Sequence, residues 1–393
     1  MPHHSGRHFL QLPGPTNTPD RVLRAMGKPT IDHRGPEFAA LTHRLLVEMR
    51  WIFGTEQTVF LYPASGSGGW EAALANTLSP GDEVLVFAQG VFARSWARVA
   101  GRFGLVVRLE SWDARRGLTA QAVTDVLAGD EGRAIKAVLV VHNETSTGVT
   151  SDVASIGAAI RSSGHSALLF VDSVSSLAVT DFRHDEWGID VTVAGSQKGL
   201  MLPPGLALLA VGKRAMAARE HAKLPRSYWD WDDHVSSNAQ GAFPYTPATH
   251  LMYGLEEAFL MLREEGLKNV FERHARYARA TRAAVIAWGL EVFALDSRES
   301  SDAATAVLVP DGHDADALRE LILERFDMSL GTGLGEYKGK VFRIGHLGDL
   351  SPLSLLGTLA GVEMGMKMVG MPHNSGGVAA AMTVLTTELG DLR

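Results

Sequence analysis

The stretch VTVAGSQKGL, residues 191–200, places a lysine directly after a short apolar run that has the composition of a buried strand. Lysine is seldom fully buried without a partner. Lys198 stands between Gly195 and Gly199, among small and apolar neighbours. A lysine removed from water has a lowered pKa and can form a Schiff base with a carbonyl group. The alternative is that Lys198 simply extends its ammonium group into solvent at a strand end, which is the common situation for a single lysine.

Similar apolar runs alternate with segments of helical spacing between about residues 40 and 215. This alternation is typical of an α/β domain with a mostly parallel sheet, and near-continuous apolar strands indicate that helices cover both faces. Polar and Gly-rich segments follow the runs, at the carboxyl ends where open α/β sheets bind ligands. The expected strands are TVFLYP (58–63), EVLVFA (83–88), AVLVVH (137–142), ALLFVD (167–172), VTVAG (191–195) and LALLAV (206–211).

The length of 393 residues favours two domains. Long amphipathic helical patterns from residue 251 to 288 lead out of the first domain, and the strands and helices beyond them predict a smaller α+β domain. The expected division is an N-terminal segment (1–20), a large domain (21–265), a small C-terminal domain (266–372) and a tail (373–393). The tail begins with HNSGGVAAA and is expected to be weakly structured.

Composition excludes several classes of function. The chain has no cysteine, which rules out disulfides, thiolate metal sites and a cysteine nucleophile, and no metal site is expected. The net charge of −7 gives no basic footprint for nucleic acid. The first residues lack an apolar signal core and no run reaches transmembrane length, which predicts a soluble cytoplasmic protein with no membrane contact.

Two further segments supply what an aldehyde cofactor bound to Lys198 would need. Pyridoxal phosphate requires an acid beside its ring nitrogen and a cradle for its phosphate. Asp172 ends the run LLFVD and is the candidate acid, although a strand-end Asp by itself is more often a cap or turn residue. SGSGG (65–69) follows a strand and opens a helix, whose N-terminal amides can hold phosphate. It fails as a dinucleotide fingerprint, because Glu71 stands where the third glycine belongs.

The chain resembles the class V, fold type I, pyridoxal-phosphate aminotransferases. The motif pair DSVSS (172–176) and GIDVTVAGSQKGLMLPPG (188–205) carries this resemblance, which extends over about residues 9 to 370. Five further segments narrow it to the serine–glyoxylate and alanine–glyoxylate branch: PGPTNTPDRVLRAM (13–26), DHRGPEF (32–38), HNETSTGV (142–149), FPYTPAT (243–249) and KVFRIGHLGDL (340–350).

The resemblance implies a role for each matching position. Lys198 would be the Schiff-base lysine and Asp172 the partner of the ring nitrogen, and these two are the expected catalytic residues. Arg343 would bind the substrate carboxylate, although an arginine taken by itself is more often a surface ion-pair residue. The expected cofactor-binding residues are Ser67, Gly68, Gly69, Phe92, Thr145, Asp172, Val174, Gln197, Lys198, Tyr245 and Thr246.

Some of these implied roles are more specific than others. Phe92 falls where relatives place an aromatic ring that stacks on the cofactor, often Trp, and a buried core phenylalanine is the alternative. Tyr245 and Thr246 match a segment that reaches the phosphate bound by a partner subunit. The resemblance therefore implies a homodimer, possibly paired into a tetramer, with shared active sites.

The expected reaction moves the amino group of L-serine, or L-alanine, to glyoxylate and yields hydroxypyruvate, or pyruvate, with glycine. L-Aspartate–glyoxylate transamination, which gives oxaloacetate, is the alternative within the branch, and the stretches YWDWDD (228–233) and GDLSPLSLLGTLAG (348–361) favour serine. A cysteine desulfurase is excluded because the chain has no cysteine. An alternative of another class is a non-catalytic regulatory protein that binds pyridoxal phosphate.

Overall fold

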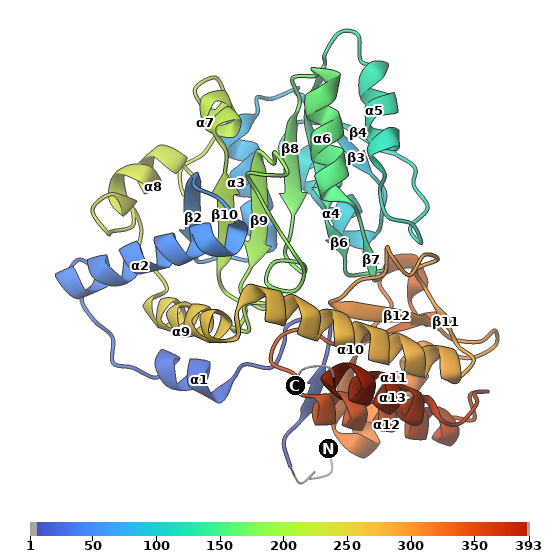
Figure 1. Cartoon of the computed structure of the whole chain (residues 1–393). Coiled ribbons are helices and arrows are strands. Elements are labelled where there is room, and N and C mark those ends of the chain that lie inside the picture. Colours follow the sequence, from blue (N-terminus) through green and yellow to red (C-terminus); the bar gives the residue numbers. More distant parts are fainter. Residues whose placement is uncertain (1–5, 391–393) are drawn as a thin grey trace.

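The computed structural model describes residues 6–390. Its larger sheet has seven strands in the order β2-β10-β9-β8-β5-β3-β4 (Figure 1). Strand β10 runs antiparallel to both of its neighbours, and the other adjacent pairs are parallel. The strands are β2 (Thr58–Tyr62), β3 (Glu83–Phe87), β4 (Val106–Glu110), β5 (Ile135–Val141), β8 (Leu168–Asp172), β9 (Val191–Gly195) and β10 (Ala207–Val211). The prediction of a mostly parallel α/β sheet is confirmed.

Helices cover both faces of this sheet because its strands alternate apolar side chains between the two sides. Leu85 joins one buried cluster, whereas Val84 and Val86 join the other. On the Leu85 side lie α2 (Pro36–Phe53), α5 (Ala120–Ala128), α6 (Val153–Ser163) and α9 (Thr249–Glu265). On the opposite side lie α3 (Gly66–Thr77), α4 (Val91–Arg102), α7 (Lys213–Arg219) and α8 (Trp231–Asn238). The short α1 (Asp20–Met26) packs against α9.

A second sheet of five strands has the order β1-β13-β14-β12-β11. Its first strand, β1, pairs in parallel with β13, and the other pairs are antiparallel. The strands are β1 (Phe9–Gln11), β11 (Glu291–Val292), β12 (Ala304–Leu308), β13 (Met328–Thr332) and β14 (Val341–Gly345). The helices packed with this sheet are α10 (Leu267–Ala287), α11 (Ala315–Phe326) and α12 (Pro352–Met368), and a 3-10 turn spans Gly335–Tyr337.

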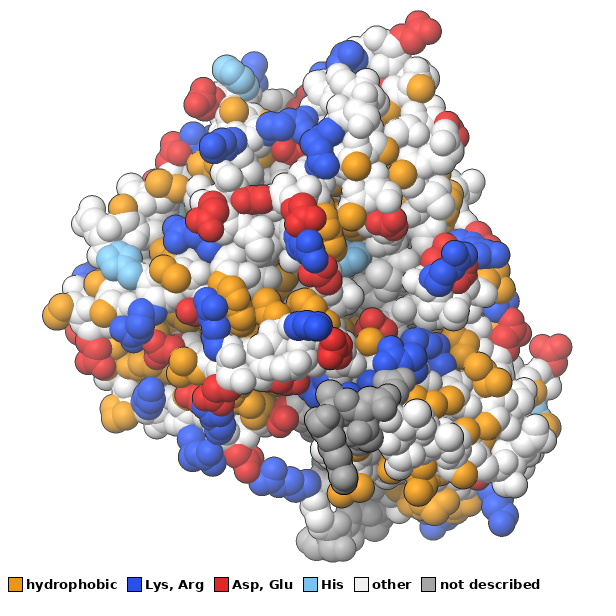
Figure 2. Space-filling model, viewed as in Figure 1, with side chains coloured by type: hydrophobic (Ala, Val, Ile, Leu, Met, Phe, Trp, Pro, Cys, Tyr) orange, Lys and Arg blue, Asp and Glu red, His pale blue; other side chains and the backbone are white. Residues whose placement is uncertain are grey.

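Gly266 separates α9 from α10 with a positive φ of 79°, at the boundary expected between the two domains. The domain division itself stays a prediction. A two-stranded hairpin, β6 (Asn143–Glu144) with β7 (Val149–Thr150), lies between the two sheets (Figure 1). Among residues 6–390, none of the helices is both long enough and apolar enough to cross a membrane. On the face shown in Figure 2, basic and acidic side chains are interspersed.

The expectation of a weakly structured tail is wrong. Residues Gly377–Gly390 form the helix α13, which lies along α10 (Figure 1). Its glycines and threonines gave the segment a polar, flexible composition, but Val378, Ala381 and Leu385 recur at helical spacing. Ala381 and Leu385 are buried against the same apolar cluster as α10 and α12. The segment before α13 is held as well, since the N–H of Asn374 donates to the carbonyl of Trp288 at 2.9 Å.

Candidate active site

The loops that follow five strands of the larger sheet enclose a cavity of about 270 Å³. Because the parallel strands end at the same edge, segments far apart in the sequence meet there. The lining residues are Gly14, Pro15, Ser65, Gly66, Ser67, Trp70, Phe92, Val141, Asn143, Thr145, Asp172, Val174, Ser175, Gln197, Lys198 and Pro204. Seven of the residues predicted to bind a cofactor are among them: Ser67, Phe92, Thr145, Asp172, Val174, Gln197 and Lys198.

Lys198 follows β9 and is 8% exposed, so it is a buried lysine and not a solvated one. Its Nζ donates a hydrogen bond to the carbonyl oxygen of Pro13 at 2.5 Å. Gly14 lets the backbone come this close, because a Cβ there would clash with the lysine side chain. Burial, together with the positive charge of Arg343, lowers the pKa of Lys198 to about 8, although the negative charge of Asp172 opposes this change. Lys198 can therefore supply a neutral amine near neutral pH.

Asp172 ends β8 and is also buried. Each of its carboxyl oxygens accepts one hydrogen bond. The N–H of Val174 donates to Oδ1 at 2.8 Å, and the indole N–H of Trp70 donates to Oδ2 at 2.9 Å. Burial, together with the nearby negative charge of Glu144, raises the pKa of Asp172 to about 7. The two N–H donors and Lys198 lower it.

The start of α3 forms a wall of the cavity with unpaired backbone donors. A helix leaves its first N–H groups without intrahelical acceptors, and Ser65 makes no side-chain cap to this helix. Such a terminus attracts a phosphate. Gln197 also lines the cavity, and the NH2 group of its side chain can donate to a phosphate. These groups fit an anionic cofactor whose other end reaches Asp172 and Lys198.

The three glycines of the segment SGSGG (65–69) have different structural roles. A Cβ on Gly66 would lie 2.5 Å from Cγ2 of Val174, so this glycine lets Val174 close over the cavity. Gly68 and Gly69 lie outside the cavity lining. A Cβ on Gly68 would approach Trp229 to 3.0 Å, and one on Gly69 would approach Cγ1 of Val193 in β9 to 2.5 Å. Gly69 therefore sets the close packing of α3 on the sheet.

A buried carboxylate fixes the start of α4, which carries Phe92. Glu144 is 1% exposed and accepts hydrogen bonds from the backbone N–H groups of Phe92 and Ala93, both at 3.1 Å. This carboxylate lies at the N-terminus of α4, where negative charge is favourable. It holds Phe92 at the cavity wall beside Thr145.

A family model described as aminotransferase class-V matches residues 8–334. The chain belongs to the class-V aminotransferases. It is 49% identical over 389 residues to a serine–glyoxylate aminotransferase of Methylorubrum extorquens, with 97% of this chain and 96% of that protein covered. It is 46% identical over 372 residues to an L-aspartate–glyoxylate aminotransferase of Paracoccus denitrificans, with 94% of each covered.

The solved structures agree. A crystal structure of pyridoxamine–pyruvate aminotransferase from Mesorhizobium loti superimposes with a TM-score of 0.92 at 31% identity and covers 99% of both chains. The predicted fold type I is thereby confirmed. This class-V aminotransferase is a transaminase and its cofactor is pyridoxal phosphate.

Arg343 lies on β14 of the second sheet and approaches the cavity from that side. It is 7% exposed and is outside the cavity lining. Its Nε donates to the carbonyl of Thr332 and its Nη1 to the carbonyl of Thr145, both at 2.8 Å. Arg343 therefore joins the second sheet to the β6 segment of the site in this aminotransferase, and its charge acts on Lys198.

Tyr245 and Thr246 also lie outside the cavity lining. Tyr245 is 36% exposed and stacks on Tyr228 with ring centroids 4.5 Å apart. Its hydroxyl lies 3.2 Å from Oγ of Ser227. Both residues lie at the surface of the chain.

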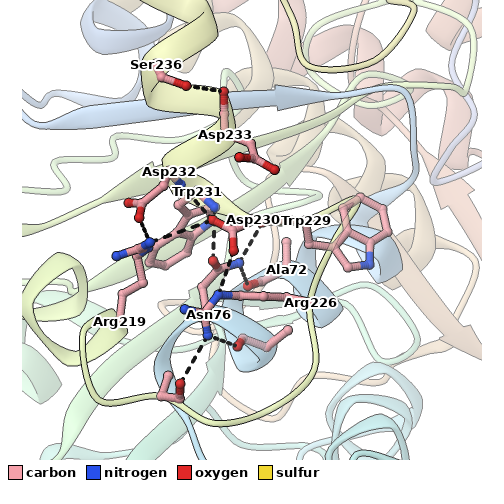
Figure 3. A network of polar contacts seen from close by, with 12 residues as sticks. Ala72, Asn76, Arg219, Arg226, Trp229, Asp230, Trp231, Asp232, Asp233 and Ser236 are labelled. Carbon is pink, nitrogen blue, oxygen red and sulfur yellow. Dashed lines mark hydrogen bonds and ion pairs between the residues drawn. The ribbon is translucent and has the colours of Figure 1, made fainter.

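The segment before α8 is anchored to α3 by a polar network, which Figure 3 shows. Asn76 is fully buried; its Nδ2 donates to the carbonyls of Ala72 and Trp229 at 2.8 and 2.7 Å, and its Oδ1 accepts from the N–H of Trp231 at 3.1 Å. Farther along, Asp230 pairs with Arg226 at 3.0 Å, and Arg219 pairs with Asp232. The network fixes the loop whose Trp229 packs against Gly68.

Several residues of the site were not predicted from the sequence. Trp70 follows the cradle directly and reads as an ordinary core residue of a helix. Asn143 and Ser175 lie beside Thr145, whose Oγ1 is 2.5 Å from Oγ of Ser175. Ser175 also accepts from Nδ2 of Asn143 at 3.2 Å. Asn143 belongs to the motif HNETSTGV and Ser175 to DSVSS, so their closeness in the sequence to Thr145 and Asp172 could have identified them as site residues.

Proposed function

We propose that this aminotransferase transfers the amino group of L-serine, or of L-alanine, to glyoxylate. Support comes from the buried Lys198 and Asp172 at one end of a cavity whose other end is the uncapped start of α3. It comes also from the 49% identity to a serine–glyoxylate aminotransferase over nearly the whole chain. The observation that carries the proposal is the buried pair of Lys198 and Asp172 in one cavity, since a phosphate cradle alone would fit many ligands.

Pyridoxal phosphate supplies an electrophilic carbonyl and a protonated ring that accepts electrons from the substrate Cα. In the proposal Lys198 provides the amine that holds the cofactor and then removes and returns the proton at Cα. Asp172 faces the ring nitrogen as a carboxylate. Ser67, Gly68 and Gln197 contact the phosphate through backbone N–H or side-chain groups, and Phe92, Val174 and Thr145 contact the ring. Gly69, whose N–H donates to the carbonyl of Ser65, keeps the start of α3 close to the sheet instead of contacting the phosphate.

Arg343 is proposed to bind the substrate carboxylate. Every candidate substrate carries a carboxylate beside the reacting carbon, and the planar guanidinium group binds such a group with two parallel hydrogen bonds. Two of its nitrogens already donate to backbone carbonyls, which fixes the orientation of the remaining donors.

A homodimer with shared sites belongs to the same proposal, with Tyr245 and Thr246 reaching the phosphate of the partner subunit. Mixing Lys198→Ala with Thr246→Ala subunits tests it, provided that each variant is inactive alone. One intact site per mixed dimer should restore about a quarter of the wild-type activity. Activity that stays at the level of the separate variants would contradict shared sites. The cytoplasmic location stays a prediction, which cell fractionation would test.

The experiment that decides the donor is a half-reaction screen of the purified holoenzyme. Serine, alanine and aspartate are added one at a time without an acceptor, and the visible absorption of the cofactor and the keto acid formed are measured. Serine or alanine should react fastest, with glycine released after glyoxylate is added. Aspartate as the fastest donor would establish the alternative, which the 46% identity to an L-aspartate–glyoxylate aminotransferase favours. No reaction with any amino acid would favour a regulatory cofactor-binding protein.

A further inference from the structure

The indole of Trp70 occupies a fixed position between two helices of the site. Trp70 is 4% exposed and stacks on Trp96 of α4, with ring centroids 5.5 Å apart and an interplanar angle of 13°. Gly69 holds α3 close to the sheet on one side of this residue. Trp70 lines the cavity, and its N–H points at Oδ2 of Asp172.

The two hydrogen bonds at Asp172 select one protonation state. An indole N–H can only donate, and so can the backbone N–H of Val174. Each donor occupies a different carboxyl oxygen, so both bonds are strongest when neither oxygen carries a proton. A carboxylate has about four acceptor positions, which leaves room for a further donor from the cavity.

The surroundings of Asp172 disfavour its negatively charged carboxylate. Asp172 is buried, and Glu144 on β6 places a second negative charge near it. The positive charge of Lys198 favours the carboxylate, but the ammonium group of Lys198 is itself disfavoured by burial and by Arg343. Burial raises the pKa of Asp172 to about 7 even with both N–H donors in place, so the loss of one donor would shift its protonation near neutral pH.

We propose that Trp70 is a positioning residue for the reaction: its indole N–H keeps Asp172 a carboxylate, so that the proton shared with the cofactor stays on the ring nitrogen. The inference rests on the role of Asp172 in the proposed function. A protonated ring is what makes the cofactor an electron acceptor, and Trp70 therefore acts on the chemistry without contacting the substrate.

The test compares Trp70→Phe with Trp96→Phe. Both substitutions replace an indole of the same stacked pair by a smaller phenyl ring. The two differ in hydrogen bonding, because the Nε1 of Trp96 is buried without a hydrogen-bond partner among the described residues. Only Trp70→Phe removes a donor from Asp172. The readout is the ¹⁵N chemical shift of the ring nitrogen in holoenzyme reconstituted with ring-¹⁵N pyridoxal phosphate, because this shift reports whether the nitrogen carries a proton.

Wild type and Trp96→Phe should both show a protonated nitrogen at pH 7.5. In Trp70→Phe the protonation equilibrium should move toward the unprotonated nitrogen by about tenfold, the equivalent of one pKa unit. A Trp70→Phe spectrum identical to wild type would overturn the inference. So would an equal change in Trp96→Phe, because that would make the effect one of packing.

Asp172→Asn separates this failure from a failure of the proposed function. If the nitrogen is protonated in wild type and loses its proton in Asp172→Asn, the role of Asp172 stands whatever Trp70→Phe does. If Asp172→Asn leaves the nitrogen protonated, the role of Asp172 fails, and with it the premise of the inference.

A second measurement needs no substitution at Trp70. In apoenzyme carrying ¹⁵N-labelled tryptophan, one indole N–H resonance should titrate with Asp172, and this titration should be absent from Asp172→Asn. It should persist in Trp96→Phe. An indole spectrum of the wild-type apoenzyme that does not change between pH 5 and 9 would contradict the inference even if Trp70→Phe failed to fold.

Discussion

At the scale of single residues, Arg343 joins two segments of the chain and is proposed to bind the substrate carboxylate, two tasks that a lysine cannot perform together. Its Nε and Nη1 donate to carbonyls in two different segments, while its charge remains available to a substrate carboxylate. Arg343→Lys should reduce kcat/KM for serine and for glyoxylate by tenfold or more, since a lost charge-assisted pair costs about 2–5 kcal/mol. Steady-state kinetics with each substrate varied would measure this.

Arg319→Lys is the matched control for Arg343→Lys. Arg319 also donates to a carbonyl of β13, that of Leu330 at 2.8 Å, but its Nη1 donates to Asp316 of its own helix, whereas Nη1 of Arg343 donates to Thr145 of the site. Its kinetic constants should stay within about twofold of wild type, as for a surface substitution away from the site. A loss for serine alone in Arg343→Lys would place the carboxylate contact elsewhere.

Lys198 and Arg343 also predict how the rate of cofactor capture depends on pH. The neutral amine of Lys198 is the nucleophile, so the rate at which apoenzyme captures pyridoxal phosphate should rise as pH passes through about 8. Arg343→Gln removes a positive charge that lowers the pKa of Lys198, so its pKa should rise and the midpoint should move to higher pH. Stopped-flow absorbance across pH 6 to 10 measures both midpoints. A midpoint that falls would contradict the coupling.

Some residues of the site were predictable because their signal is local in the sequence. Lys198 and Asp172 each follow an apolar strand, and their place at one sheet edge follows from parallel pairing. The role of Trp70 was not predictable. Its partner Asp172 is distant in the sequence, and a tryptophan in an apolar helix is usually interpreted as a core residue. The Pro13 carbonyl beside Lys198 depends on how the second sheet docks, which local sequence does not specify.

At the scale of elements, the packing of α3 on the sheet depends on Gly69. A Cβ at this position would lie 2.5 Å from Val193 and 3.2 Å from Leu209. Gly69→Ala should therefore lower the free energy of unfolding by about 1–3 kcal/mol through overpacking, and should weaken cofactor binding because Ser67 and Trp70 move with the helix. Urea denaturation and a cofactor titration measure the two effects.

Gly101→Ala on α4 is the control for this substitution. A Cβ there would meet only Cγ2 of Val107 at 3.9 Å, which is ordinary contact. Alanine is a better helix former than glycine, so Gly101→Ala should stabilise the protein by about 0.5–1 kcal/mol. Equal effects of the two substitutions would show that Gly69 has no special packing role.

Elements were predicted well where burial is complete and poorly where it is partial. The six expected strands all form, within one or two residues of their predicted ends. The edge strand β4 was missed, because its residues are half exposed and VVRLE has no continuous apolar run. The helix α13 was missed because glycine and threonine outweighed a narrow stripe of apolar residues.

At the scale of the whole molecule, α13 stabilises the second sheet and its helices. Leu385 is 2% exposed, whereas Met382 on the same helix is 48% exposed. Leu385→Ala should lower the free energy of unfolding by about 2–4 kcal/mol, because it opens a cavity in a buried cluster. Met382→Ala should change it by less than about 0.5 kcal/mol. Equal urea midpoints for the two variants would show that α13 does not contribute to the core.

The pairing of β1 with β13 has a consequence for the order in which this protein can be completed during synthesis. Phe9 pairs with Met328, and the segment that follows β1 brings the Pro13 carbonyl to Lys198. The ribosome releases β1 early, but β13 only after the larger sheet has been made. Pairing across so long a stretch of chain is intrinsically slow. Pro13 therefore reaches Lys198 late, and a nascent chain acquires its finished cofactor pocket only after most of its length has emerged.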